Sequence, residues 1–241
     1  MIESVIDFKN YTLKISSSDK SSEAIILFHG FPAEPVTDPS KEKNIDLARY
    51  LAKNLNSDVF IHHYSGLGRS QGKEFNFINS VEDSIELINY ISKYYDHINL
   101  IGHSWGGLVA INCLDECPRI RKSLLLSPFN LIPENKILEP VLNDLMKEIP
   151  HLLEDKSIND YLSEFDVIRR SYCPREKMKH LKSEATIFIL QALDDNEVSL
   201  QSTLDLIKIS KKDINIDILE TDHAFKINRE ILFKKTLEFL K

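Results

Sequence analysis

The chain has 241 residues, of which 42% are hydrophobic and 28% are charged, a profile typical of one soluble globular domain. Lysine and arginine number 30, whereas aspartate and glutamate number 37, which gives a net charge of −7. This acidic balance argues against binding to nucleic acid or to an anionic membrane surface, and it leaves neutral and cationic substrates open.

Three features of the sequence bear on the cellular compartment of the protein. Residues 1–7 lack the basic and apolar regions of a signal peptide, and no apolar run reaches the length of a membrane span. The odd number of cysteines (Cys113, Cys117 and Cys173) favours reduced thiols. We therefore expect a cytoplasmic protein. Cys113 and Cys117 have no third ligand nearby in the sequence, so core packing is favoured over metal binding. We expect neither a metal nor a cofactor.

The hydrophobic pattern of the first half of the chain alternates between strands and helices. Such alternation indicates a parallel sheet that is covered on both faces and binds ligands at the C-terminal ends of its strands. The expected elements, in chain order, are a hairpin over 3–16, a strand over 24–28, a helix over 45–55, a strand over 58–62, a helix capped by Ser80 with Tyr95 on its apolar face, a strand and turn over 97–105, a helix to about Glu116 and a strand over 122–128.

Residues 129–183 break this alternation and are expected to be entirely helical. Pro140 is expected to open one helix, and Asn159 or Asp160 to cap another. The segment is too long for a plain connection, so we interpret it as a helical lid over the strand ends. The alternation then resumes with a strand over 185–190, a helix over 200–209, a strand over 214–219 and a closing helix over 230–240.

The pattern Gly-x-Ser-x-Gly stands at residues 102–106, between an apolar strand and a helix. In the nucleophile elbow, a sharp turn of this kind strains the serine backbone and pushes its hydroxyl out above the sheet. Gly102 and Gly106 suit positions where strand and helix nearly touch. The helix N-terminus behind Ser104 favours negative charge at that point. The pattern therefore predicts that Ser104 is a nucleophile.

A serine hydroxyl becomes an effective nucleophile with a base to take its proton, an acid to orient that base and donors for the oxyanion. Loops that follow the last two predicted strands supply candidates for the acid and the base. The loop over 191–198 contains Asp194 and Asp195, and the next strand is followed by His223. The candidates thus occur in the order Ser104, Asp195, His223.

With these residues in this order, the chain resembles the α/β-hydrolase superfamily over nearly its whole length. Ser104 matches the family's nucleophile, and His223 matches its base. Asp195 matches the acid, because the family usually has a small apolar residue three positions later and Val198 stands there. This spacing favours Asp195 over Asp194.

The segment His29-Gly30-Phe31-Pro32 matches the family's first oxyanion segment. The resemblance implies the backbone N–H groups of Phe31 and Trp105 as oxyanion donors. Residues 65–72 resemble the family's Arg-Gly-x-Gly-x-Ser-x-Gly loop. Within the superfamily, the chain looks most like small esterases of the cinnamoyl-esterase and serine-aminopeptidase-like branch. No catalytic atom is removed by the departures from the family's pattern, which are Ser65, Ala192 and Ser199.

The resemblance implies an α/β-hydrolase fold, with a mostly parallel sheet flanked by helices. Residues 1–128 and 184–241 would form this core, and the small helical lid over 129–183 would be inserted after the sixth strand. Aromatic side chains near the site would belong to the lid core or to a substrate wall, and the candidates for the wall are Phe129, Phe165 and Tyr172.

The implied activity is that of a carboxylesterase-like serine hydrolase. It would cleave a small-molecule ester, thioester or amide through an acyl-enzyme, without a cofactor. One alternative is an acyltransferase or thioesterase of a biosynthetic pathway, which differs only in the access of water to the acyl-enzyme. A second alternative is a ligand-binding protein on a hydrolase scaffold. Steady turnover, as opposed to a single stoichiometric acylation, would separate the second alternative from an enzyme.

Overall fold

The computed structural model describes residues 1–17, 21–31, 44–70, 74–154 and 156–241. Two expected features lie outside these residues: the proline-containing loop that runs through Pro35 and Pro39, and residues 71–72 at the end of the loop over 65–72. Among the helices of the described ranges, none is long and apolar enough to cross a membrane.

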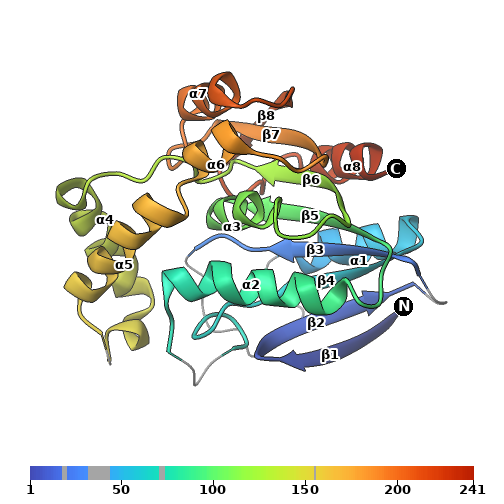
Figure 1. The fold of residues 1–241 in the computed structure, drawn as a ribbon, viewed down its shortest axis with the longest axis horizontal. Coiled ribbons are helices and arrows are strands. Elements are labelled where there is room, and N and C mark those ends of the chain that lie inside the picture. Colours follow the sequence, from blue (N-terminus) through green and yellow to red (C-terminus); the bar gives the residue numbers. More distant parts are fainter. Residues whose placement is uncertain (18–20, 32–43, 71–73, 155) are drawn as a thin grey trace.

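In the described part of the chain, eight strands form one sheet in the order β1-β2-β4-β3-β5-β6-β7-β8 (Figure 1). The first two strands are antiparallel to their neighbours, and the six from β4 to β8 run parallel. The mostly parallel sheet predicted from the sequence is therefore confirmed. The strands are β1 (Ile2–Phe8), β2 (Asn10–Ser16), β3 (Glu23–Phe28), β4 (Ser57–His62), β5 (His97–His103), β6 (Ile120–Leu126), β7 (Thr186–Asp194) and β8 (Asn215–Asp222).

Helices cover both faces of this sheet (Figure 1). One buried cluster joins the sheet to α2 and α3, and a second joins its other face to α1 and α8. The helices are α1 (Ile45–Asn54), α2 (Phe77–Ile91), α3 (Trp105–Cys113), α4 (Asn135–Glu148), α5 (Ile158–Ser171), α6 (Pro174–His180), α7 (Leu200–Ile209) and α8 (Arg229–Leu240), with a 3₁₀ turn over Pro150–Leu153.

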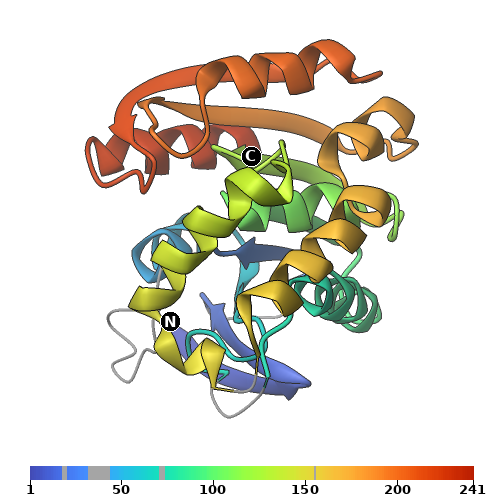
Figure 2. The ribbon, with the colours of Figure 1, turned by 90° about the vertical axis from the view of Figure 1, so that its left-hand side faces the viewer.

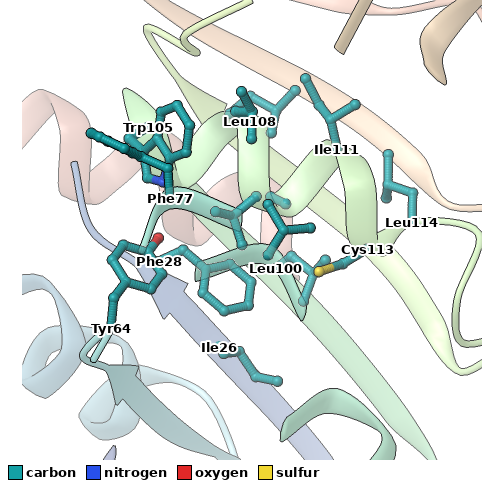
Figure 3. Packing of buried hydrophobic residues seen from close by; sticks show 14 of the residues in the cluster. Ile26, Phe28, Tyr64, Phe77, Leu100, Trp105, Leu108, Ile111, Cys113 and Leu114 are labelled. Atoms are coloured by element: carbon teal, nitrogen blue, oxygen red, sulfur yellow. The ribbon is translucent and has the colours of Figure 1, made fainter. Parts of the chain in front are cut away.

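Strand β3 shows why the central strands are apolar throughout. Ile26 and Phe28 belong to the cluster on the α3 side, whereas Ile25 and Leu27 belong to the cluster on the α1 side. Successive side chains of a strand point to opposite faces, so a strand that is covered on both sides needs apolar residues at every position. Figure 3 shows the α3 side of this packing.

The predicted start of α2 at Ser80 is wrong. The helix begins one turn earlier, at Phe77, where the Asn76 side chain accepts hydrogen bonds from two backbone N–H groups of the first turn, at 2.7 and 3.1 Å. Ser80 lies inside the helix, and its hydroxyl donates to the Phe77 carbonyl at 2.6 Å. Tyr95 lies beyond the end of the helix. Asparagine is as good an N-cap as serine, so the sequence pattern could not separate the two.

Two further helix starts differ from the prediction. Pro140 lies inside α4, which begins at Asn135, rather than opening it. The exposed position of Pro140 lets water satisfy the carbonyl that its missing N–H leaves unpaired. Ser157 caps α5 in a capping box, in which Asp160 accepts a hydrogen bond from the Ser157 backbone N–H at 2.8 Å.

The expected helical segment over 129–183 is helical and lies between β6 and β7 in the chain. Helices α4 and α5 pack on each other beyond one end of the sheet, where Figure 2 shows them crossing in front of the core. Helix α6 instead packs on α3 and α7, within the layer that covers the sheet (Figure 1). Thus α4 and α5, which we call the cap, are the part of the segment that lies beyond the strand ends.

Candidate active site

A sharp turn joins β5 to α3 and has Ser104 at its apex. The Ser104 backbone has φ 53° and ψ −116°, a conformation that L residues rarely adopt. A Cβ added to Gly102 would lie 2.3 Å from the Gly106 carbonyl oxygen, and one added to Gly106 would lie 2.1 Å from the Phe28 carbonyl oxygen. Both glycines are therefore required by the close approach of the strands and the helix.

We expect Gly106→Ala to destabilise the protein by roughly 2–3 kcal/mol, because β3 and α3 must move apart to admit the new methyl group. The direction of this change in the free energy of unfolding distinguishes a close contact from an ordinary helix position, because alanine in an ordinary helix is about 1 kcal/mol more favourable than glycine. Urea unfolding measures the change. An unchanged or raised midpoint would contradict the close contact with Phe28.

The two expected oxyanion donors lie in chain segments next to Ser104. Trp105 is the first residue of α3, where geometry leaves the backbone N–H without an acceptor inside the helix. Phe31 lies in the loop after β3. This loop passes beside the serine, because a Cβ added to Gly30 would lie 3.0 Å from Ser104 Cβ. The structure therefore brings both donor segments to the serine.

Asp195 and His223 form a hydrogen-bonded pair in the loops after β7 and β8. His223 Nδ1 lies 2.9 and 2.8 Å from the two carboxylate oxygens, so Nδ1–H donates to the carboxylate. Burial alone would raise the pKa of Asp195, but hydrogen bonds from His223 and from the backbone of Val198 hold that pKa below its ordinary value. The pair is therefore an ionised acid that orients an imidazole.

The adjacent carboxylates after β7 have different surroundings. Asp194 is exposed and lies at the strand end, in register with Asp222. The Asp195 side chain is buried and reaches His223. The Asp195 carboxylate also accepts from the backbone N–H of Val198 at 2.7 Å, and the Val198 side chain is buried beneath the turn. The structure brings Asp195, and not Asp194, to the histidine.

Gln191 is a neighbour of this pair that sequence reasoning missed. Its side chain is fully buried, and its Nε2 donates to Asp195 at 3.3 Å and to the Val198 carbonyl at 2.9 Å. Its Oε1 accepts from the Thr203 hydroxyl of α7 at 2.7 Å. These bonds tie the acid loop to a helix. A single glutamine at a strand end carries no sequence signal of such a role.

The base loop is attached to the residue before the nucleophile. His103 Nε2 lies 2.8 Å from the His223 carbonyl oxygen, and because a carbonyl only accepts, His103 is the donor. The two rings lie 4.9 Å apart. His223 Nε2 is buried and makes no hydrogen bond with any residue of the described ranges, although a Glu197 carboxylate oxygen lies 3.3 Å away.

Aromatic side chains gather next to Ser104. Phe77 contacts both Trp105 and Phe165, with ring centroids 4.8 and 4.5 Å apart, and Phe31 stacks on Phe75 at 5.4 Å. Figure 3 shows Phe77 and Trp105 side by side. We call Phe31, Phe75, Phe77, Trp105 and Phe165 the aromatic cluster. It connects both expected oxyanion segments with the cap helix α5.

The other two aromatic candidates lie in different places. The Phe129 backbone N–H donates to the Ser104 carbonyl at 2.9 Å, so this residue lies next to the nucleophile. The Tyr172 hydroxyl donates to Glu82 on α2 at 2.8 Å, and the Tyr172 carbonyl accepts from Asn112 on α3 at 2.9 Å. These contacts tie Tyr172 to the helical layer rather than to the nucleophile.

A buried ion pair, also missed from the sequence, attaches the cap to the core. Glu164 of α5 accepts from the Phe77 backbone N–H at 2.8 Å and from Lys156 at 2.7 Å. Lys156 also donates to the Phe75 carbonyl at 2.8 Å. Burial raises the pKa of Glu164, and its donors partly offset this rise. The ion pair holds α5 against two members of the aromatic cluster.

Metal ligands are not grouped in this region. Among the residues that the structure describes, no set of three or more histidine, cysteine, aspartate or glutamate side chains could hold a metal ion. Cys113 and Cys117 are buried and free of disulfides. Burial raises the pKa of the Cys113 thiol well above its ordinary value, so this side chain is a neutral core residue.

The sheet order, the elbow at Ser104 and the Asp195–His223 pair define an α/β-hydrolase. Residues 19–216 match the model of the family described as serine aminopeptidase, S33, and the chain belongs to this family. It is therefore a hydrolase of the carboxylesterase-like kind. Among curated proteins, no sequence matches this chain.

Solved structures share the fold over nearly the whole chain. Est1E from Butyrivibrio proteoclasticus with bound ferulic acid has a TM-score of 0.74 at 16% identity, covering 98% of this chain and 97% of that one. A lipase-esterase related protein from Clostridium acetobutylicum has a TM-score of 0.68 at 17% identity, covering 95% and 99%. A monoacylglycerol lipase from Paleococcus ferrophilus has a TM-score of 0.68 at 18% identity, covering 97% and 98%. At these identities the similarity shows the fold alone.

Proposed function

We propose that the protein hydrolyses carboxylic esters of small molecules through a triad of Ser104, His223 and Asp195. The observation that carries this proposal is the buried hydrogen bond of His223 Nδ1 to Asp195, at 2.8 Å. It leaves the other ring nitrogen free to act as a base. The strained elbow of Ser104 next to the base loop supports the same assignment.

In this mechanism Ser104 attacks the ester carbonyl while His223 Nε2 takes the hydroxyl proton. The Asp195 carboxylate stabilises the imidazolium, and the backbone N–H groups of Phe31 and Trp105 hold the oxyanion. The imidazolium then gives its proton to the departing alcohol. Water attacks the acyl-enzyme with His223 as base, which releases the acid. The mechanism requires a hydrogen bond from the Ser104 hydroxyl to His223 Nε2 in the substrate complex, and bonds of this kind commonly tighten only on binding.

The proposal is tested with p-nitrophenyl esters of rising acyl length, run beside acyl-thioesters and aminoacyl amides. The ferulic acid bound to Est1E favours adding a feruloyl ester to this panel. Steady release of free acid supports an esterase. Transfer of the acyl group to an added alcohol in preference to water would favour an acyltransferase, and a single stoichiometric acylation would contradict turnover.

We further propose that the cap, which is the α4 and α5 part of the segment over 129–183, acts as a lid, and that Phe129 and Phe165 form parts of the substrate wall. Both lie next to Ser104 or Trp105: the Phe129 N–H bonds to the Ser104 carbonyl, and the Phe165 ring lies 5.8 Å from that of Trp105. Tyr172 is left out of this proposal because its hydrogen bonds are with the helical layer.

Phe165→Ala should change the preference for acyl length by roughly tenfold relative to activity on a small acetate ester. Removing the ring opens space beside Trp105, and a lost apolar contact with substrate is worth about 1–3 kcal/mol. The ratio of kcat/KM values for long and short esters measures the change.

Phe165→Leu is the matched variant, because it keeps most of the volume and is expected to retain the wild-type preference. Phe165 is only 3% exposed, so thermal unfolding of both variants must accompany the kinetics. If Phe165→Ala unfolds the protein, and a folded Phe165→Trp variant leaves the preference unchanged, the residue belongs to the core and not to the wall.

A further inference from the structure

Glu197 places a negative charge beside the catalytic atom of the base. Its carboxylate oxygen lies 3.3 Å from His223 Nε2, and 63% of its side chain is exposed. His223 itself is 9% exposed, and its Nε2 makes no hydrogen bond with any residue in the described part of the chain. A charged, exposed side chain therefore lies beside a buried nitrogen that the proposed mechanism reserves for substrate.

The backbone fixes Glu197 at this place independently of its side chain. The Glu197 N–H donates to the Asp195 carboxylate at 2.9 Å, in the same turn that the N–H of Val198 completes at 2.7 Å. Because Asp195 in turn bonds to His223, the turn that orients the base also directs Glu197 to its Nε2 side. Replacing the carboxylate by an amide leaves all of these bonds in place.

In the proposed mechanism, the leaving group of the substrate must approach the Glu197 carboxylate. Nε2 protonates the leaving group, so the leaving group must come within hydrogen-bonding distance of the atom that Glu197 now contacts. The carboxylate must then move aside, and its exposure allows this while the loop keeps it a few ångströms away. Its charge acts on whatever charge the leaving group carries, because a site partly shielded from water strengthens Coulomb interactions.

We propose that Glu197 is a specificity-determining residue that favours esters whose leaving group carries a positive charge, such as an ammonium group, and disfavours anionic ones. This inference rests on the proposed function. Two other carboxylates of the loop do not share this role. Asp195 is paired with the opposite ring nitrogen, and Asp194 is exposed at the strand end.

The test compares butyrylthiocholine with 3,3-dimethylbutyl thiobutyrate, a pair that differs in the charge of the leaving thiol and hardly in shape. Released thiol is measured for both substrates. Wild-type protein should show a higher kcat/KM for the cationic thioester. Glu197→Gln should lower the cationic-to-neutral ratio by roughly tenfold, the size expected of a partly exposed charge pair a few ångströms apart. Glu197→Lys should invert the preference.

Asp194→Asn is the matched control, since it removes an exposed carboxylate of the same loop that does not contact the base, and its ratio should match wild type. Raising the salt concentration should reduce the wild-type ratio by screening and leave that of Glu197→Gln unchanged. If the neutral thioester is cleaved and Glu197→Gln keeps the wild-type ratio, only this inference is overturned. If no ester or thioester is cleaved, the proposed function fails with it.

Discussion

Ser104→Ala should abolish covalent labelling by a fluorophosphonate probe and lower ester turnover by about 10⁴ or more, the scale of losing a triad nucleophile. The hydroxyl is the only group removed. The Ser104 side chain caps no N–H group of α3, so the helix loses no hydrogen bond. Thermal stability should therefore stay nearly unchanged, which separates a loss of chemistry from a loss of fold.

Intact-protein mass spectrometry measures this result, because a single adduct is expected on the wild-type chain. Ser163→Ala is a suitable control, since Ser163 is exposed and, among the residues that the structure describes, its hydroxyl bonds only to the Asn159 carbonyl in the same helix, α5. That variant should label and turn over as wild type does. Labelling that survives in Ser104→Ala would show that the nucleophile lies elsewhere.

Asp195→Asn should leave the fold intact and cut turnover by as much as about 10⁴, the effect of losing the acid that fixes the tautomer of the base. An asparagine amide in place of the carboxylate cannot accept the Nδ1 proton through both oxygens or stabilise an imidazolium. Asp194→Asn should cost less than about tenfold, or under roughly 1.4 kcal/mol of barrier. The two carboxylates are adjacent in sequence, so each variant is the control for the other.

Steady-state kinetics and circular dichroism on both variants decide the outcome. The surroundings of Asp195 predict the asymmetry: its side chain is buried with the imidazole, whereas Asp194 faces solvent. A large loss in Asp194→Asn with little change in Asp195→Asn would mean that the turn after β7 is shifted by one residue in solution.

The sequence predicted the mostly parallel sheet and the succession of strands and helices along the chain, because those signals are local. The apolar run of β3 reflects burial of that strand itself, and the glycines around Ser104 reflect the tight turn in which they lie. The spacing from Asp195 to Val198 is equally local, and it identified the carboxylate that the structure brings to His223. Such short-range patterns can be recognised in a single amino-acid sequence.

The misses came from contacts between distant segments. The start of α2 is held by Glu164, which is 87 residues away in the sequence, so a choice between two good capping residues could not be made locally. Gln191 and Glu197 are ordinary polar residues until the fold brings one to Asp195 and the other to His223. The Tyr172 hydroxyl likewise bonds to Glu82, which is 90 residues away, and no sequence pattern predicts this contact.

The segment between β6 and β7 consists of two parts with different structural roles. Helix α6 completes the crossover between two paired parallel strands and contacts α3 and α7, so it belongs to the framework of the sheet. Helices α4 and α5 contribute no member of the candidate triad. Exchanging these two helices would therefore leave every residue of the candidate triad in place, and under the proposed lid role it would change the preference for the acyl group.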